Sequence, residues 1–179
     1  MMNQRIVLTK TLLKNSLITL LQTQSIYRIS IRELCETAGI NRSTFYKYYG
    51  NQFDLLNEME QDLLINIEEA LRNEKGYDKN VLENILVYLE GNIDFIRLLL
   101  NSNVDPEFPK SLMSMAPIQR ILKSQMTGLP EVEQDYYNRF LLFGCYEIVR
   151  TWINKEDRES PTWIAELMLK CISNSVVQS

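Results

Sequence analysis

The chain has 179 residues, 45% of them hydrophobic, and it carries a net charge of −4 without any histidine. This hydrophobic fraction supports a sizeable core and excludes a chain that is disordered throughout. Because the commonest metal ligand and general base are missing and no pair of acidic residues stands out, we expect no metal site, no cofactor and no enzyme activity.

Membrane and export signals are absent from the sequence. No run of about 18 uninterrupted apolar residues occurs, so we expect no membrane-spanning helix. The N-terminal stretch lacks the sustained apolar segment and the small-residue cleavage site of a secretory signal. A cytoplasmic protein is therefore expected.

The first predicted helix runs from about Asn3 to Gln24. Its leucines recur at the spacing of one buried helical face: Leu13, Leu17, Leu20 and Leu21. Lys10 and Lys14 lie on a polar flank of this helix, where we expect them either to be solvated or to contact a phosphate.

Two short helices separated by a glycine follow the first helix. Ser30 and Glu33 form a capping box, in which each side chain can bind a backbone N–H at the other's position. Gly39 stands where the first short helix must end with a positive φ. Asn41 can cap the second, Arg42 to Tyr49. Together these elements are the outline of a helix-turn-helix, which makes the fold class all-α in this region.

The second short helix is too polar and aromatic for an ordinary core helix. Phe45 and Tyr49 can face inward, which leaves the other side chains for the surface. A recognition helix places its N-terminal residues on base edges, and Arg42, Ser43 and Thr44 hold that position. Arginine can donate a bidentate pair to guanine, and hydroxyl groups can bind bases or phosphates. Two interpretations follow: a DNA-reading helix, or a small helix pair inside another helical protein.

Three motifs in this region share their order and spacing with a known family. They are Ile31-Arg32-Glu33-Leu34-Cys35, Ala38-Gly39-Ile40-Asn41 and Ser43-Thr44-Phe45-Tyr46-Lys47-Tyr48-Tyr49, followed by Asp54-Leu55. Over roughly Arg5 to Leu56, without a gap, the chain resembles the DNA-binding domain of TetR-type transcriptional regulators. The resemblance implies an all-α fold with an N-terminal three-helix DNA-binding domain, residues 1–56, and a C-terminal helical domain for regulation and dimerisation, residues 57–179.

The resemblance also implies which residues contact DNA. In such regulators the helix after the glycine turn enters the major groove. The DNA-binding residues implied here are Arg32, Arg42, Ser43, Thr44, Tyr46, Lys47, Tyr48 and Gln52. Two positions depart from the family pattern, which usually has a histidine in place of Tyr48 and a phosphate-binding lysine in place of Gln52. Because Gln52 brings no charge, we expect the salt-sensitive part of the DNA affinity to be smaller.

The charge of the chain is unevenly distributed. Residues 1–57 contain seven basic and three acidic side chains, a net charge of +4, and the remainder contains twelve basic and twenty acidic ones, a net charge of −8. A positive N-terminal third on an acidic body suits a chain that presents one end to a polyanion. A difference of this size can also arise by chance, so it only supports the motif.

Further helices are predicted in the body of the chain. One is expected from about Asn51 to Asn73, with a polar loop after Arg72. Residues 78–101 keep one apolar face. The one strongly polar residue on that face, Asn92, is either a satisfied core amide or a polar anchor in a ligand cavity. Residues 110–126 are predicted to be helical but interrupted near a proline, Pro117, which lacks a backbone donor.

The body also contains candidate residues for a small-molecule site. Flexible methionines in residues 110–126 suit an adaptable pocket wall, although filling gaps in a core is their commoner use. The candidate ligand-binding residues are Tyr88, Asn92, Phe95, Met113, Tyr136, Phe140 and Tyr146. Each of them can equally be ordinary core.

Two amphipathic helices are predicted near the end of the sequence, over residues 132–155 and 160–177. Ser160 can cap the second of them. Gly144, within the apolar stripe of the first, costs about 1 kcal/mol of helix propensity, so we expect a close packing neighbour there. In TetR-like proteins two such helices pair with the same two of a second subunit. The resemblance therefore implies a homodimer, which a two-fold DNA site with two reading heads requires.

The expected function is a homodimeric transcriptional regulator, a repressor that a small-molecule effector or a partner releases from a double-stranded DNA operator. Such a switch requires the effector to bind two conformations with different affinity. The alternative is a protein-interaction co-regulator whose helix-turn-helix head reads DNA weakly or not at all. Gln52 and the acidic body favour this alternative.

Overall fold

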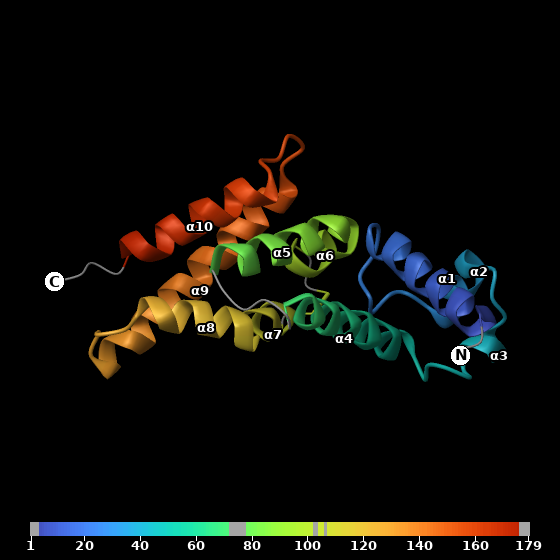
Figure 1. Ribbon diagram of the computed structural model, residues 1–179. Coiled ribbons are helices and arrows are strands. Elements are labelled where there is room, and N and C mark those ends of the chain that lie inside the picture. Colours follow the sequence, from blue (N-terminus) through green and yellow to red (C-terminus); the bar gives the residue numbers. More distant parts are fainter. Residues whose placement is uncertain (1–3, 72–77, 102–103, 106, 176–179) are drawn as a thin grey trace. The chain divides into compact units, whose positions relative to one another are not determined.

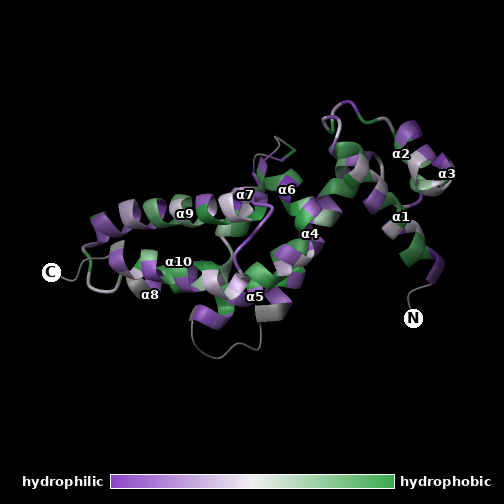
Figure 2. Ribbon diagram, turned by 90° about the horizontal axis from the view of Figure 1, so that it is seen from above, coloured by the Kyte–Doolittle hydropathy of each residue, from purple (hydrophilic) through white to green (hydrophobic). Residues whose placement is uncertain are grey.

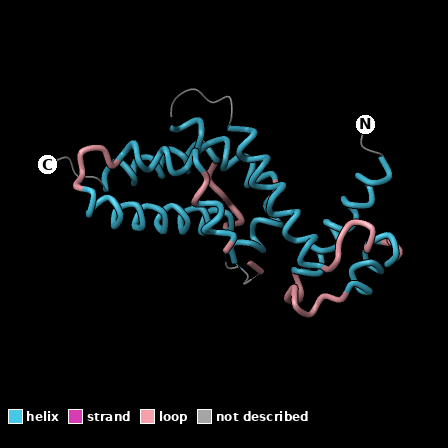
Figure 3. The backbone as a smooth tube through the Cα atoms, turned by 90° about the horizontal axis from the view of Figure 1, so that it is seen from below, coloured by secondary structure: helices cyan, strands magenta, loops and turns pink. Residues whose placement is uncertain are grey.

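The computed structural model describes residues 4–71, 78–101, 104–105 and 107–175, and these residues form helices joined by loops (Figures 1 and 3). The helices are α1 (Gln4–Leu21), α2 (Ile31–Ala38), α3 (Arg42–Phe45), α4 (Gln52–Leu71), α5 (Asp78–Gly91), α6 (Ile93–Asn101), α7 (Phe108–Met113), α8 (Ala116–Gln125), α9 (Glu131–Asn154) and α10 (Pro161–Ser175). No strand occurs among the described residues, which confirms the all-α fold. The loop expected after Arg72 lies outside the described residues.

The chain divides into two compact units. The N-terminal unit comprises Met1–Leu64 with Ser102–Asp105, and the second comprises Ile65–Asn101 with Pro106–Ser179. The division falls inside α4, so this helix contributes to both units. A functional boundary after Leu56 stays a prediction. None of the described helices has both the length and the apolar character that crossing a bilayer requires.

Local sequence signals explain how α2 begins and ends. The Ser30 hydroxyl accepts a hydrogen bond from the backbone N–H of Glu33 at 3.1 Å, as expected for an N-cap. The Glu33 carboxylate instead accepts from the Gln24 side-chain amide at 2.6 Å. Gly39 ends α2 in the left-handed conformation with φ 66°, which glycine adopts without a steric penalty. The chain therefore leaves α2 in the direction that α3 requires.

The second unit buries its apolar side chains between helix layers. α5 packs against α10, and α6 packs against α9. Its largest fully buried side chain is Trp152 on α9, whose indole N–H donates to the Glu159 carbonyl at 2.8 Å. Ser160 caps α10 as expected, because its hydroxyl accepts from the Trp163 N–H at 3.2 Å. The expected interruption near Pro117 is also confirmed, because this residue lies in the first turn of α8.

Residues 78–101 form two helices where the sequence predicted a single apolar face. The break lies at Asn92, directly after Gly91, and both are poor helix formers. The Asn92 side-chain amide donates to the Tyr88 carbonyl at 2.9 Å, and the Asn92 carbonyl accepts from Ile96 at 3.0 Å. Asn92 is exposed, so the expectation that it is a core amide was wrong.

Candidate nucleic-acid interface

The candidate DNA-reading segment, defined as Arg42–Tyr48, is shorter as an α-helix than expected. α3 ends at Phe45, and Lys47 and Tyr48 continue the chain in tight turns, donating to the Thr44 and Phe45 carbonyls at 3.3 and 2.9 Å. Asn41 occupies the N-cap position, but its side chain makes no capping hydrogen bond. Because these i to i−3 bonds belong to the tighter 3₁₀ geometry, the segment keeps its direction beyond the single α-helical turn.

The reading segment turns its polar side chains outward. Arg42, Ser43 and Lys47 are exposed, and 53% of Tyr46 is exposed. Thr44 and Tyr48 are half-buried. The two aromatic residues expected to face inward, Phe45 and Tyr49, are 0% and 4% exposed. Neither Arg42 nor Lys47 takes part in an ion pair among the described residues.

A shallow concavity of about 480 Å³ joins α2 to the start of the reading segment. It is lined by Arg32 and Glu36 on α2, Gly39 in the turn, and Arg42 and Ser43. The exposed Arg32 guanidinium lies 2.7 Å from the Glu36 carboxylate, one helical turn further on. Exposed ion pairs of this kind contribute little to stability, so Arg32 can exchange Glu36 for a phosphate at small cost.

Gln52 lies at the start of α4 and is half-buried. Its side-chain amide donates to the Ile26 carbonyl at 3.4 Å, so the amide is directed at the loop between α1 and α2. Among the candidate DNA contacts that the structure describes, Gln52 is the one whose side chain hydrogen-bonds to a different element of the N-terminal unit.

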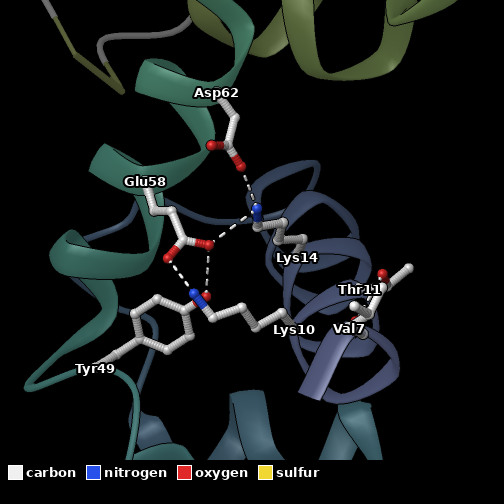
Figure 4. Close-up of polar contacts among 7 residues, drawn as sticks. All are labelled: Val7, Lys10, Thr11, Lys14, Tyr49, Glu58 and Asp62. Carbon is white, nitrogen blue, oxygen red and sulfur yellow. Dashed lines mark hydrogen bonds and ion pairs between the residues drawn. The ribbon is translucent and has the colours of Figure 1, made fainter. Parts of the chain in front are cut away.

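Lys10 and Lys14 are half-buried and paired with acids on α4, so they are neither fully solvated nor left unpaired for a phosphate, which corrects the expectation for this flank of α1. Lys10 Nζ lies 2.6 Å from the Glu58 carboxylate, and Lys14 Nζ lies 3.0 Å from Glu58 and 2.6 Å from Asp62 (Figure 4). Both acids are on α4, just beyond residues 1–57, so the charge count over that segment left them out. The positive charge available to a polyanion is therefore concentrated nearer the reading segment.

Another carboxyl group of the N-terminal unit, that of Glu60, is buried beside the half-buried Asp105. Glu60 on α4 is 7% exposed, and its carboxyl group hydrogen-bonds to that of Asp105. Burial and the neighbouring Asp105 carboxylate raise the pKa of Glu60 to about 8, from an ordinary value of 4.5. Glu60 therefore holds a proton in the folded protein at pH values where the unfolded chain has lost it.

This difference predicts a pH-dependent stability. The contribution of the Glu60 proton is complete below about pH 4.5 and is lost as the pH rises through about 8. We expect the free energy of unfolding to fall between about pH 5 and pH 8, and Glu60→Gln to remove most of this fall. Denaturant titrations at several pH values test this, with the exposed Glu68→Gln as the control. An equally steep fall in Glu60→Gln would contradict it.

The candidate ligand residues do not line one common cavity. Asn92, Tyr136 and Phe140 are exposed, whereas Phe95 is buried within its unit and Tyr88 is half-buried. The body helices enclose a void of about 40 Å³ with an apolar lining. Sites for drug-sized molecules are typically about 300–1,000 Å³, so this void holds no such ligand.

Two of the candidates share an open groove. Met113 and Tyr146 line a groove of about 520 Å³ formed by α7, α8 and α9, and the cations Lys110 and Arg139 are also among its lining residues. The Tyr146 hydroxyl donates to the Leu100 carbonyl at 3.0 Å, so its polar group already has a partner inside the unit.

The last two helices, α9 and α10, carry hydrophobic residues among hydrophilic ones (Figure 2), and several of their large apolar side chains are exposed. The exposed ones are Val132, Tyr136, Phe140 and Phe143 on α9 and Trp163 on α10. An open groove of about 730 Å³ runs between these helices. A Cβ added to Gly144 would meet nothing within 4 Å, so the close neighbour expected there is not found among the described residues. Phe143 and Trp163 were missed from the sequence, although both continue the apolar spacing of their helices.

Comparisons with known proteins place this chain among transcriptional regulators. Residues 79–174, more than half of the chain, match the family described as TetR_C_8, "Transcriptional regulator C-terminal region". A TetR transcriptional regulator from Streptococcus agalactiae 2603V has a similar solved structure. It is 26% identical, with 94% of this chain and 96% of that one covered and a TM-score of 0.73.

Two curated relatives have related sequences. The uncharacterized HTH-type regulator YxbF of Bacillus subtilis (strain 168) is 22% identical over 172 residues, which cover 89% of this chain and 43% of YxbF. The HTH-type dhaKLM operon transcriptional activator DhaS of Lactococcus lactis subsp. lactis (strain IL1403) is 28% identical over 88 residues, which cover 48% of this chain and 46% of DhaS. The chain thus spans less than half the length of these relatives.

Proposed function

This chain belongs to the TetR family of transcriptional regulators, and from that premise we propose that it is a homodimer that binds an operator through Arg42–Tyr48. The observation that carries the proposal is the arrangement of this segment. Phe45 and Tyr49 anchor it in the core, while Arg42, Tyr46 and Lys47 face solvent. Arg32, Ser43, Thr44, Tyr48 and Gln52 complete the proposed DNA contacts.

The proposed homodimer is formed by α9 and α10. A large exposed apolar surface on a soluble chain commonly marks an interface with another protein. A second copy would cover Phe140 and Trp163 and would place its own helices near Gly144. The two reading heads would then face successive turns of one side of the duplex.

Gly144→Ala tests this packing with effects of opposite sign. In the separated protomer the added methyl group meets nothing, so we expect helix propensity to raise the free energy of unfolding by about 1 kcal/mol. In the dimer the same methyl group should press against the partner and weaken association. Denaturant unfolding at low protein concentration and sedimentation at high concentration measure the two effects. Unchanged association would place the close contact elsewhere.

The proposed regulation is repression that an effector relieves. We propose that a small-molecule effector binds the open groove at Met113 and Tyr146, because its volume of about 520 Å³ is typical of ligand sites, whereas the apolar void between the body helices measures about 40 Å³. DhaS is named an activator, so the direction of regulation needs its own test. Deleting the gene should raise expression from the operator if the protein is a repressor and lower it if the protein is an activator.

A gel-shift titration with promoter DNA from its own and neighbouring genes tests the DNA-binding function. We expect one promoter to shift specifically in the presence of excess unrelated duplex. If no promoter shifts, the co-regulator function takes its place. The internal hydrogen bond of Gln52 and the small size of the void between the body helices, about 40 Å³, favour this second candidate, since a partner protein could then act on the surface.

A further inference from the structure

One carboxylate on α4 is hydrogen-bonded to two other elements of the N-terminal unit (Figure 4). Glu58 Oε2 accepts from Lys10 Nζ at 2.6 Å, and Oε1 lies 3.0 Å from Lys14 Nζ, both on α1. Glu58 Oε1 also accepts from the Tyr49 hydroxyl at 2.9 Å, directly after the reading segment. Glu58 thus joins α4 to both α1 and the end of the reading segment.

Ring contacts continue from Tyr49 to the surface of the reading segment. The Tyr49 ring lies 5.5 Å from the Phe45 ring, and the Phe45 ring lies 5.6 Å edge-on from the Tyr46 ring, centroid to centroid. Phe45 is 0% exposed and Tyr46 is 53% exposed, so the contacts run from the core to an exposed side chain. A displacement of Glu58 has a continuous packed route to Tyr46.

The reading segment depends on such contacts for its orientation. An isolated helix of one turn is unstable in water, because nucleation costs more than the first hydrogen bonds return. α3 is one turn long and its continuation is a series of tight turns. Packing of Phe45 holds the segment against the core, but apolar packing is not directional. The Tyr49–Glu58 hydrogen bond is directional, so it fixes the rotation of the segment relative to α4.

We propose that Glu58 is a positioning residue that transmits the position of α4 to the DNA-reading segment through the Tyr49 hydroxyl. The proposal rests on DNA reading by that segment. Burial alone would raise the pKa of Glu58, but its hydrogen bonds from Lys10, Lys14 and Tyr49 outweigh burial and lower it. Burial and the Glu58 hydrogen bond raise the pKa of Tyr49, so this hydroxyl keeps its proton and stays a donor.

Tyr49→Phe breaks the link, Glu58→Gln weakens it by leaving only a neutral amide oxygen to accept from Tyr49, and a third substitution controls for charge. Tyr49→Phe removes only the hydroxyl, and Glu58→Gln removes the carboxylate charge. Asp62→Asn removes the same charge from α4, but Asp62 pairs with Lys14 and not with Tyr49. Because loss of a negative charge raises affinity for any duplex, the informative quantity is the ratio of operator affinity to unrelated-duplex affinity.

We expect Tyr49→Phe and Glu58→Gln each to lower this affinity ratio about fivefold to tenfold. The affinity ratio of the double variant should lie within about twofold of the lower of the two single-variant ratios, because both substitutions act on the same interaction. Asp62→Asn should change the ratio by less than about twofold. An unchanged ratio in both single variants overturns the proposal, even if their melting temperatures fall, because the network would then only stabilise the fold.

A measurement without DNA separates this proposal from the proposed function. Glu58→Gln should shift the backbone amide resonances of Arg42–Tyr46 in the free, full-length protein, and Asp62→Asn should leave them in place. If the parent protein selects no operator, the proposed function fails and the resonance comparison alone decides. Unmoved Arg42–Tyr46 resonances in Glu58→Gln would then overturn the positioning role.

Discussion

Replacing Arg42 and Tyr46 together by alanine is expected to abolish specific operator binding, with a loss of at least about 30-fold in affinity. Each good contact to a base edge is worth about 1–3 kcal/mol of discrimination, and two such contacts are removed. Both side chains are exposed, so the substitution should cost little stability. Fluorescence anisotropy with a labelled operator measures the loss, and circular dichroism and sedimentation check helicity and dimer formation.

The control for this double variant is Arg120→Ala, which removes an exposed arginine from α8 of the body. We expect it to change operator affinity by less than about twofold at fixed salt, because α8 lies in the second unit. If the double variant binds the operator as tightly as the parent, Arg42–Tyr48 is not the reading segment.

Phe140→Glu is expected to convert the dimer into monomers. Phe140 is 63% exposed in one chain and lies in the apolar groove between α9 and α10. A carboxylate placed there would have to leave water on association without a partner, which costs several kcal/mol. We therefore expect the dissociation constant of the dimer to rise by more than about 100-fold and the operator affinity to fall with it.

Sedimentation at micromolar concentration measures this effect. Val87→Glu is the matched control, since Val87 is 52% exposed on α5 and outside the proposed interface. The control should remain a dimer. A dimeric Phe140→Glu variant, or a parent protein that is monomeric at the same concentration, would exclude α9 and α10 as the interface.

Local signals were the most reliable part of the sequence. Ser30 and Gly39 determine the two ends of α2 through contacts within a few residues, so they could be identified without tertiary information. Phe45 and Tyr49 were assigned to the core by helical spacing. That assignment holds although α3 ends at Phe45, because the Tyr49 N–H still donates to the Phe45 carbonyl at 3.1 Å, the spacing of one α-helical turn, which keeps both rings on the same side.

Tertiary partners were not visible in the same way. Lys10 hydrogen-bonds to Glu58 and Lys14 to Asp62, and in both pairs the acid on α4 lies 48 residues further along the chain. No helical periodicity relates positions so far apart. The apolar stripe of residues 78–101 did not reveal the break at Asn92, since two helices in succession can share one spacing. Which side chains face a cavity depends on how several helices pack together, and the sequence does not show this. The candidate ligand-binding residues therefore lie at different places in the body and do not line one cavity.

The spacing of operator half-sites tests the central claim most directly. DNA selected by the parent protein from a random pool should contain an inverted repeat with half-site centres about 34–36 Å apart, or a multiple of that distance. Inserting about five base pairs, half a helical turn, between the half-sites should reduce affinity to that of unrelated DNA. An operator that tolerates this insertion, or a selection that yields no inverted repeat, would contradict a dimer with two reading heads.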